Sequence, residues 1–289
     1  GAEMLDKVLR DLIHGEFSVG KTTFAFLDVL LTVCITGTAV LIRQSIFGIS
    51  GNPGISGGMA MFIYCALDFV LALLMAVFVW KTTGNHLKTV GVYSLAVIWP
   101  AIAGNSALNG GPEVIAAVTL VVLLCIIAAK KAYKMGSFWC VTLLACVFQI
   151  LQGDEPATKL TNCWPNIYTL FSETGYYNEY GFTGKLLVFG ILLMVFYYIS
   201  KKKINVNPEL LVASGLFVSL FISAFYPFMN YRSGLMANVF ALLLFIQNKN
   251  KFYVPMSMCI ISYVSYGYFY NKEIGVFFWI YALGLVVLM

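Results

Sequence analysis

Residues 113–129 read EVIAAVTLVVLLCIIAA and are followed at once by Lys130 and Lys131. An apolar run with no charge after its first residue is typical of a helix in lipid, and a lysine pair is typical of a helix end at a membrane surface. The whole chain has this character, because 60% of its 289 residues are hydrophobic, 11% are charged and the mean hydropathy is +0.85. Soluble globular domains have about 25% charged residues. The sequence therefore predicts an all-α polytopic transmembrane bundle rather than a soluble protein.

Apolar segments recur along the chain and predict about ten helices. They lie at 24–45, 58–80, 89–104, 113–129, 137–152, 185–200, 208–226, 234–247, 252–270 and 274–289. Residues 1–23 are charged and amphipathic, and they lack the apolar core and cleavage site of a secretory signal. We expect a cytoplasmic N-terminal segment at 1–23 and one polytopic transmembrane domain at 24–289.

The basic residues are distributed unevenly over the predicted loops. With the N-terminus in the cytoplasm, thirteen of the 18 Lys and Arg residues lie inside, and the outer ones are Arg43, Lys159, Lys185, Arg232 and Lys272. This bias favours a topology with both ends of the chain in the cytoplasm. The net charge of +5 is scattered over short clusters rather than gathered in one patch, so we expect no nucleic-acid partner.

The predicted outer-face loop at 153–184 is rich in aromatic residues. They are Trp164, Tyr168, Phe171, Tyr176, Tyr177, Tyr180 and Phe182. Disordered linkers contain few aromatic residues, whereas amphipathic aromatic side chains favour the headgroup region of a bilayer. We expect this loop to lie on the outer membrane surface, and stacking on sugar rings is the alternative.

Residues 15–22 read GEFSVGKT and match the G-x-x-x-x-G-K-T pattern of a phosphate-binding loop. A working loop of this kind follows a strand and opens a helix in a soluble sheet domain. Here it follows a charged segment and leads into a membrane span, which argues against nucleotide binding. The seven cysteines show no metal-ligand spacing. We therefore expect no cofactor and no metal.

Ionisable residues inside apolar segments are costly, so Asp28, Asp68 and Glu113 are functional candidates. Asp68 lies in the middle of a span and needs a buried partner. Glu113 has three interpretations: a solvated carboxylate, a favourable charge at a helix N-terminus, or a general base. Arg232 lies in a short turn between two spans, where it could bind a phosphate or anchor the turn at the interface.

Three segments share an order with one known family. Residues 100–116 read PAIAGNSALNGGPEVIA, residues 164–168 read WPNIY, and residues 227–233 read PFMNYRS. They resemble the P-x-x-x-x-N-S-x-x-W-G-Q-x-D, P-N-I-Y and P-H-M-H-E-R-Y stretches of a bacterial branch of the GT-C-fold membrane glycosyltransferases. That branch is similar to the second mannosyltransferase of GPI-anchor synthesis.

The resemblance implies sugar transfer from a polyprenyl-phosphate donor on the outer face of the bacterial inner membrane. Glu113 then corresponds to the catalytic carboxylate and Arg232 to a contact for the lipid phosphate. The other residues that the resemblance places at the substrate are Asn105, Asn109, Trp164, Tyr168 and Asn230.

The chain departs from the family pattern where the chemistry is expected. Its first outer loop, GISGNPG at 48–54, has no acid where the family carries an aspartate. Asn109 replaces a tryptophan, and Asn230 replaces a histidine. The sequence therefore leaves open whether the chain is an enzyme. Its alternatives are a catalytically inactive GT-C-like module that binds a lipid-linked glycan or a partner protein, and a small-molecule transporter.

Overall fold

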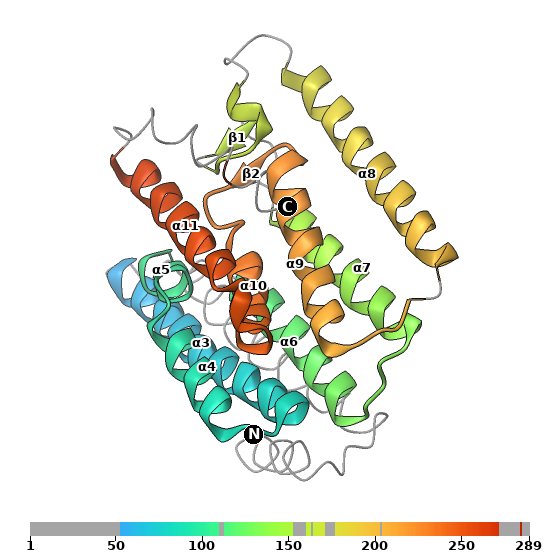
Figure 1. Ribbon diagram of the computed structural model, residues 1–289. Coiled ribbons are helices and arrows are strands. Elements are labelled where there is room, and N and C mark those ends of the chain that lie inside the picture. The colour runs from blue at the N-terminus through green and yellow to red at the C-terminus, as the bar shows by residue number, and fades with distance from the viewer. Residues whose placement is uncertain are drawn as a thin grey trace.

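A computed structural model describes residues 53–109, 113–152, 160–162, 164–170, 177–202, 204–271 and 284. This part of the chain is mostly helical (Figure 1). Its α-helices are α3 (Pro53–Thr83), α4 (His86–Ile98), α5 (Pro100–Asn109), α6 (Glu113–Ala129), α7 (Met135–Leu151), α8 (Tyr177–Lys201), α9 (Pro208–Phe225), α10 (Leu235–Gln247) and α11 (Tyr253–Asn271). The N-terminal segment at 1–23, the phosphate-loop pattern at 15–22 and the predicted spans at 24–45 and 274–289 lie outside the described residues.

In the described part of the chain, four helical stretches are long and apolar enough to cross a membrane, which indicates a membrane protein. These stretches are Ile63–Thr83 in α3, His86–Asn105 across α4 and α5, Tyr180–Lys201 in α8 and Pro208–Phe225 in α9. Three further apolar helices, α6, α7 and α10, are shorter than these. The prediction of a transmembrane helical protein is thus confirmed in its coarse form. The count of about ten spans and the GT-C fold stay predictions.

One predicted helix is divided in two. We expected a single helix at 89–104, but α4 ends at Ile98 and α5 begins at Pro100, with Trp99 in an extended conformation at ψ 119°. Proline has no N–H for the helical ladder, and it disfavours the helical conformation of the residue before it. The indole nitrogen of Trp99 donates a hydrogen bond to Asn238 Oδ1 of α10 over 3.0 Å, which holds the break inside the bundle.

The helices differ in how deeply they lie in the bundle. In α9, 61% of the apolar stretch is buried inside the protein, whereas in α8 only 17% of the apolar stretch is buried. Figure 1 shows α8 (yellow) along one edge of the bundle, beside α7 and α9. A hydrophobic helix exposed to this degree in a membrane protein has lipid as its solvent. The apolar surface of α8 therefore faces the bilayer.

The aromatic loop is shorter and more buried than the sequence predicted. Helix α8 begins at Tyr177, so the last residues of the predicted loop at 153–184 belong to a helix. Residues 164–170 fold into the protein rather than over a membrane surface, because Trp164 is 0% and Tyr168 8% exposed. Glycine makes this packing possible. A Cβ atom at Gly234 would lie 2.5 Å from the Trp164 ring, and one at Gly184 would clash with the Tyr168 hydroxyl.

A short parallel pairing ties this segment to the turn between α9 and α10. Strand β1 (Thr161–Asn162) pairs with β2 (Met229–Asn230). Just before β2, the backbone N–H of Phe228 donates to the carbonyl of Leu160 over 2.7 Å, and Phe228 adopts a φ of 67°. This left-handed conformation costs a non-glycine residue about 1–2 kcal/mol. The pairing and the burial of the Phe228 ring hold the residue there.

Basic residues gather in the turns at one end of the bundle. Nine lysines lie at or beside the α3–α4, α6–α7, α8–α9 and α10–α11 turns: Lys81, Lys88, Lys130, Lys131, Lys134, Lys201, Lys202, Lys249 and Lys251. Arg232 lies in the α9–α10 turn at the other end, together with β2. The bundle therefore has a lysine end, shown toward the lower right of Figure 1, and a second end that carries the residues considered next.

Candidate functional site

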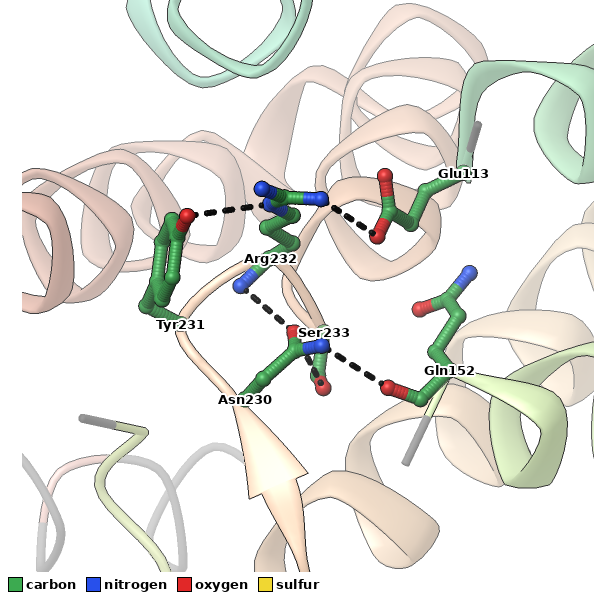
Figure 2. Close-up of polar contacts among 6 residues, drawn as sticks. All are labelled: Glu113, Gln152, Asn230, Tyr231, Arg232 and Ser233. Carbon is green, nitrogen blue, oxygen red and sulfur yellow. Dashed lines mark hydrogen bonds and ion pairs between the residues drawn. The ribbon is translucent and has the colours of Figure 1, made fainter. Parts of the chain in front are cut away.

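The two residues that the sequence singled out for chemistry form an ion pair. Glu113 is the first residue of α6, and Arg232 lies in the turn between α9 and α10. Arg232 Nη1 is 3.7 Å from Glu113 Oε1 (Figure 2). The Glu113 side chain is 6% exposed and that of Arg232 is 27% exposed. Glu113 is therefore not a solvated carboxylate, and its position at the start of α6 is favourable for a negative charge.

Tyr231 holds the guanidinium from the other side. Arg232 Nε donates to the Tyr231 hydroxyl over 3.1 Å, and the guanidinium carbon lies 5.2 Å from the centre of the Tyr231 ring. Burial lowers the pKa of Arg232, but the hydrogen bond with Tyr231 and the charge of Glu113 outweigh this effect and raise the pKa. Arg232 is thus a fixed positive charge with part of its surface open.

Asn230 orders the turn that carries Arg232. Its Oδ1 accepts hydrogen bonds from the backbone N–H of Arg232 over 2.9 Å and from the Ser233 hydroxyl over 3.4 Å. Its Nδ2 donates to the backbone carbonyl of Gln152 over 3.0 Å, which joins the turn to the end of α7 (Figure 2). One buried amide therefore orders the turn and joins it to the end of α7.

The helices around the turn contribute buried polar side chains. Gln149 Nε2 donates to the Ser223 hydroxyl over 2.9 Å and to the carbonyl of Ser233 over 2.8 Å. Gln152, the residue directly after the end of α7, points its amide toward Glu113 in Figure 2. The Gln152 amide and that of fully buried Asn105 have no hydrogen-bond partner within the described part of the chain. Buried polar groups normally have partners, so these amides are suited to contact water or a bound polar group.

The predicted site residues have different outcomes. The structure brings Glu113, Arg232 and Asn230 together in one network (Figure 2). Asn105 is fully buried on α5, and Asn109 ends α5 with a side chain outside the described residues.

Trp164 and Tyr168 serve packing in this structure. The Tyr168 hydroxyl donates to the carbonyl of Phe225 over 3.0 Å, and burial raises its pKa to about 12. Trp164 lies against Gly234 with none of its surface exposed. Neither ring presents a face for a sugar to stack on.

Sequence reasoning missed Tyr231 and Gln152. Tyr231 directly precedes Arg232, and an aromatic residue beside an arginine is a usable signal for a held guanidinium. Gln152 is a polar residue at the end of an apolar segment, which is a weak signal. The orientation of the Gln152 amide toward Glu113 depends on packing between segments that are distant in sequence.

No family model, curated protein or solved structure matches the chain. Chemically, the site offers a carboxylate that can accept a proton and an arginine that can bind an anion. Among the described residues, no group of three His, Cys, Asp or Glu side chains could hold a metal ion.

Proposed function

We propose that the protein is a multi-pass protein of the bacterial cell membrane that uses the Glu113–Arg232 pair to act on a polyprenyl-phosphate-linked sugar. One observation carries the proposal. The carboxylate and the guanidinium that the family resemblance assigns to proton transfer and phosphate binding are 119 positions apart in sequence, yet they meet at 3.7 Å. A chance resemblance gives no reason for these two positions to be neighbours.

The charges of the bundle support an outward-facing site. The nine lysines listed with the fold lie at the opposite end from Arg232. Lysine-rich loops remain in the cytoplasm during membrane insertion. The end with Glu113 and Arg232 then faces outward, where polyprenyl-phosphate sugars serve as donors instead of nucleotide sugars in the family that the chain resembles.

Arg232 has the donors that a phosphate requires. A guanidinium carries five N–H groups, and the contacts with Tyr231 and Glu113 involve Nε and Nη1. Because the side chain is 27% exposed, a phosphate can reach the remaining N–H groups without displacing the core. Binding there stabilises the negative charge that builds up on the phosphate as the sugar leaves.

Glu113 would serve as the general base. An acceptor hydroxyl attacks the anomeric carbon, the bond to the phosphate oxygen breaks with its electron pair on the phosphate, and Glu113 takes the hydroxyl proton. A general base of this kind contributes about 10²–10⁴-fold in rate. The Gln152 amide, aimed at Glu113, is placed to hold the acceptor or a water molecule beside the carboxylate.

A catalytically inactive membrane module that binds a lipid-linked glycan or a membrane-protein partner is the second candidate. It is favoured by the 6% exposure of the Glu113 side chain and by its existing pairing with Arg232. A carboxylate held in this way can be structural. In that case the carrier lipid binds at Arg232 but no sugar is transferred.

Variants that replace a charged side chain by a neutral one of similar size distinguish these candidates. Membranes containing each variant are given polyprenyl-phosphate mannose as the donor probe, and released polyprenyl phosphate is measured. For an enzyme, we expect Glu113→Gln to lower the rate by at least about 100-fold in protein that is still folded. The double variant Glu113→Gln with Arg232→Gln removes both charges, so neither partner is left buried and unpaired.

The activity of the double variant decides whether the ion pair takes part in catalysis. If it releases polyprenyl phosphate at the wild-type rate, the pair is structural and the enzymatic reading is wrong. Arg232→Lys is the matched control for charge: it keeps the positive charge but loses the planar fork, so we expect partial activity.

A further inference from the structure

Five exposed lysines occupy two turns at the lysine end. Lys130, Lys131 and Lys134 lie in the α6–α7 turn, and Lys201 and Lys202 lie where α8 ends. We call these five residues the lysine cluster. Of the other four lysines at this end, Lys81, Lys88 and Lys251 are only partly exposed, and the exposed Lys249 lies in the separate α10–α11 turn. The five charged groups are therefore open to a partner.

An aromatic contact brings the two turns close together. The rings of Trp139 on α7 and Phe196 on α8 meet edge to face, with centroids 5.2 Å apart. Lys134 lies five residues before Trp139, and Lys201 lies five residues after Phe196. Five residues of helix correspond to about 7.5 Å. Because the start of α7 and the end of α8 lie at the same end of the bundle (Figure 1), both lysine groups border one region.

Within the described part of the chain, little negative charge opposes the lysine cluster. Among the side chains that the structure describes, Glu209 in the first turn of α9 is the carboxylate at this end of the bundle. Its Oε1 accepts a hydrogen bond from Asn248 Nδ2 over 3.0 Å. The cluster therefore has a net positive charge that an anion can balance.

The surface beside the cluster suits a lipid rather than a free anion. Lys201 and Lys202 place their ammonium groups 4.5 Å from the ring centres of Tyr197 and Tyr198. These tyrosines are 62% and 60% exposed. One turn further into the membrane, Leu193 and Met194 are also exposed. Positive charge, tyrosine rings and apolar side chains thus follow one another along α8, in the order of headgroup, interface and acyl chains.

We propose that the lysine cluster and the adjoining exposed face of α8 form a binding site for an anionic phospholipid. The lysines contact the phosphate, the tyrosine rings lie at the level of the glycerol, and Leu193 and Met194 contact the acyl chains. This site is at the opposite end from Glu113 and does not depend on the proposed function.

Native mass spectrometry of the full chain in a non-ionic detergent tests the proposal, with phosphatidylglycerol as the probe and phosphatidylcholine as its neutral counterpart. The test variant carries Lys130→Gln, Lys131→Gln, Lys201→Gln and Lys202→Gln. The control variant carries Lys81→Gln, Lys88→Gln, Lys249→Gln and Lys251→Gln, which removes the same charge from the same end. A lysine near a membrane surface is worth about 1 kcal/mol toward anionic lipid, or about fivefold.

We expect the wild type to prefer phosphatidylglycerol and the test variant to lose affinity by on the order of several hundredfold, because the fivefold contributions of four lysines multiply. The control variant keeps its affinity, and arginines at the four test positions restore binding, which separates loss of charge from loss of folding. Equal binding of phosphatidylcholine, an equal loss in the control variant, or displacement of the lipid by millimolar inorganic phosphate would overturn the proposal.

Discussion

The two ends of the bundle carry their polar residues in different ways. At the lysine end, charged side chains such as Lys131 and Lys202 are exposed and lie in separate turns. At the other end, Asn230 and Glu113 are buried, and Arg232 is held between Glu113 and Tyr231. Solvated charges interact weakly with their neighbours, whereas buried polar groups depend on one another. Substitutions at the lysine end should therefore change stability little. Substitutions at the other end, which carries Glu113 and Arg232 and is called the site end below, should change it more.

The largest expected effect tests packing at the site end. Trp164→Ala removes a fully buried ring that lies against Gly234, and substitutions of this kind in a core cost about 3–5 kcal/mol. The thermal midpoint in detergent should fall by many degrees. Tyr197→Ala, at a site 62% exposed near the lysine end, is the control and should change stability by less than about 0.5 kcal/mol. Equal effects of the two substitutions would refute the difference between the ends.

A smaller effect is expected from the hydrogen-bond network. Asn230→Ala leaves the Gln152 carbonyl and the Arg232 backbone N–H without their partner, at a cost of about 1–3 kcal/mol. Asn250→Ala, the same substitution at an exposed position of the lysine end, should be close to neutral. Thermal unfolding of both variants checks this. A stable Asn230→Ala protein would mean that the turn does not depend on this amide.

Local patterns were sufficient to locate most helices. The apolar run at 113–129 coincides with α6, and the segment at 208–226 with α9, because a run of apolar residues followed by lysine, proline or polar residues is a signal within one segment. The break at Trp99 was also present in the sequence, as Pro100, but the apolar residues on both sides concealed it.

The burial of the aromatic loop could not be predicted in the same way. Whether Trp164 lies on a membrane surface or inside the protein depends on Gly234 and on the pairing of β1 with β2, and both Gly234 and β2 are more than 60 positions away. The Glu113–Arg232 contact likewise joins segments separated by three helices. Periodicity describes one element at a time, so it identified both residues as candidates but could not show that they pair.

The most direct test of the account is whether the site end holds a lipid phosphate through Arg232. Native mass spectrometry of the full chain, purified from its membrane in a mild detergent, would detect retained polyprenyl phosphate or its sugar conjugate. The account predicts a bound carrier in the wild type and in the lysine-cluster variant, and its loss in the charge-neutral Glu113→Gln, Arg232→Gln variant. A carrier that stays bound without Arg232 would contradict the central claim.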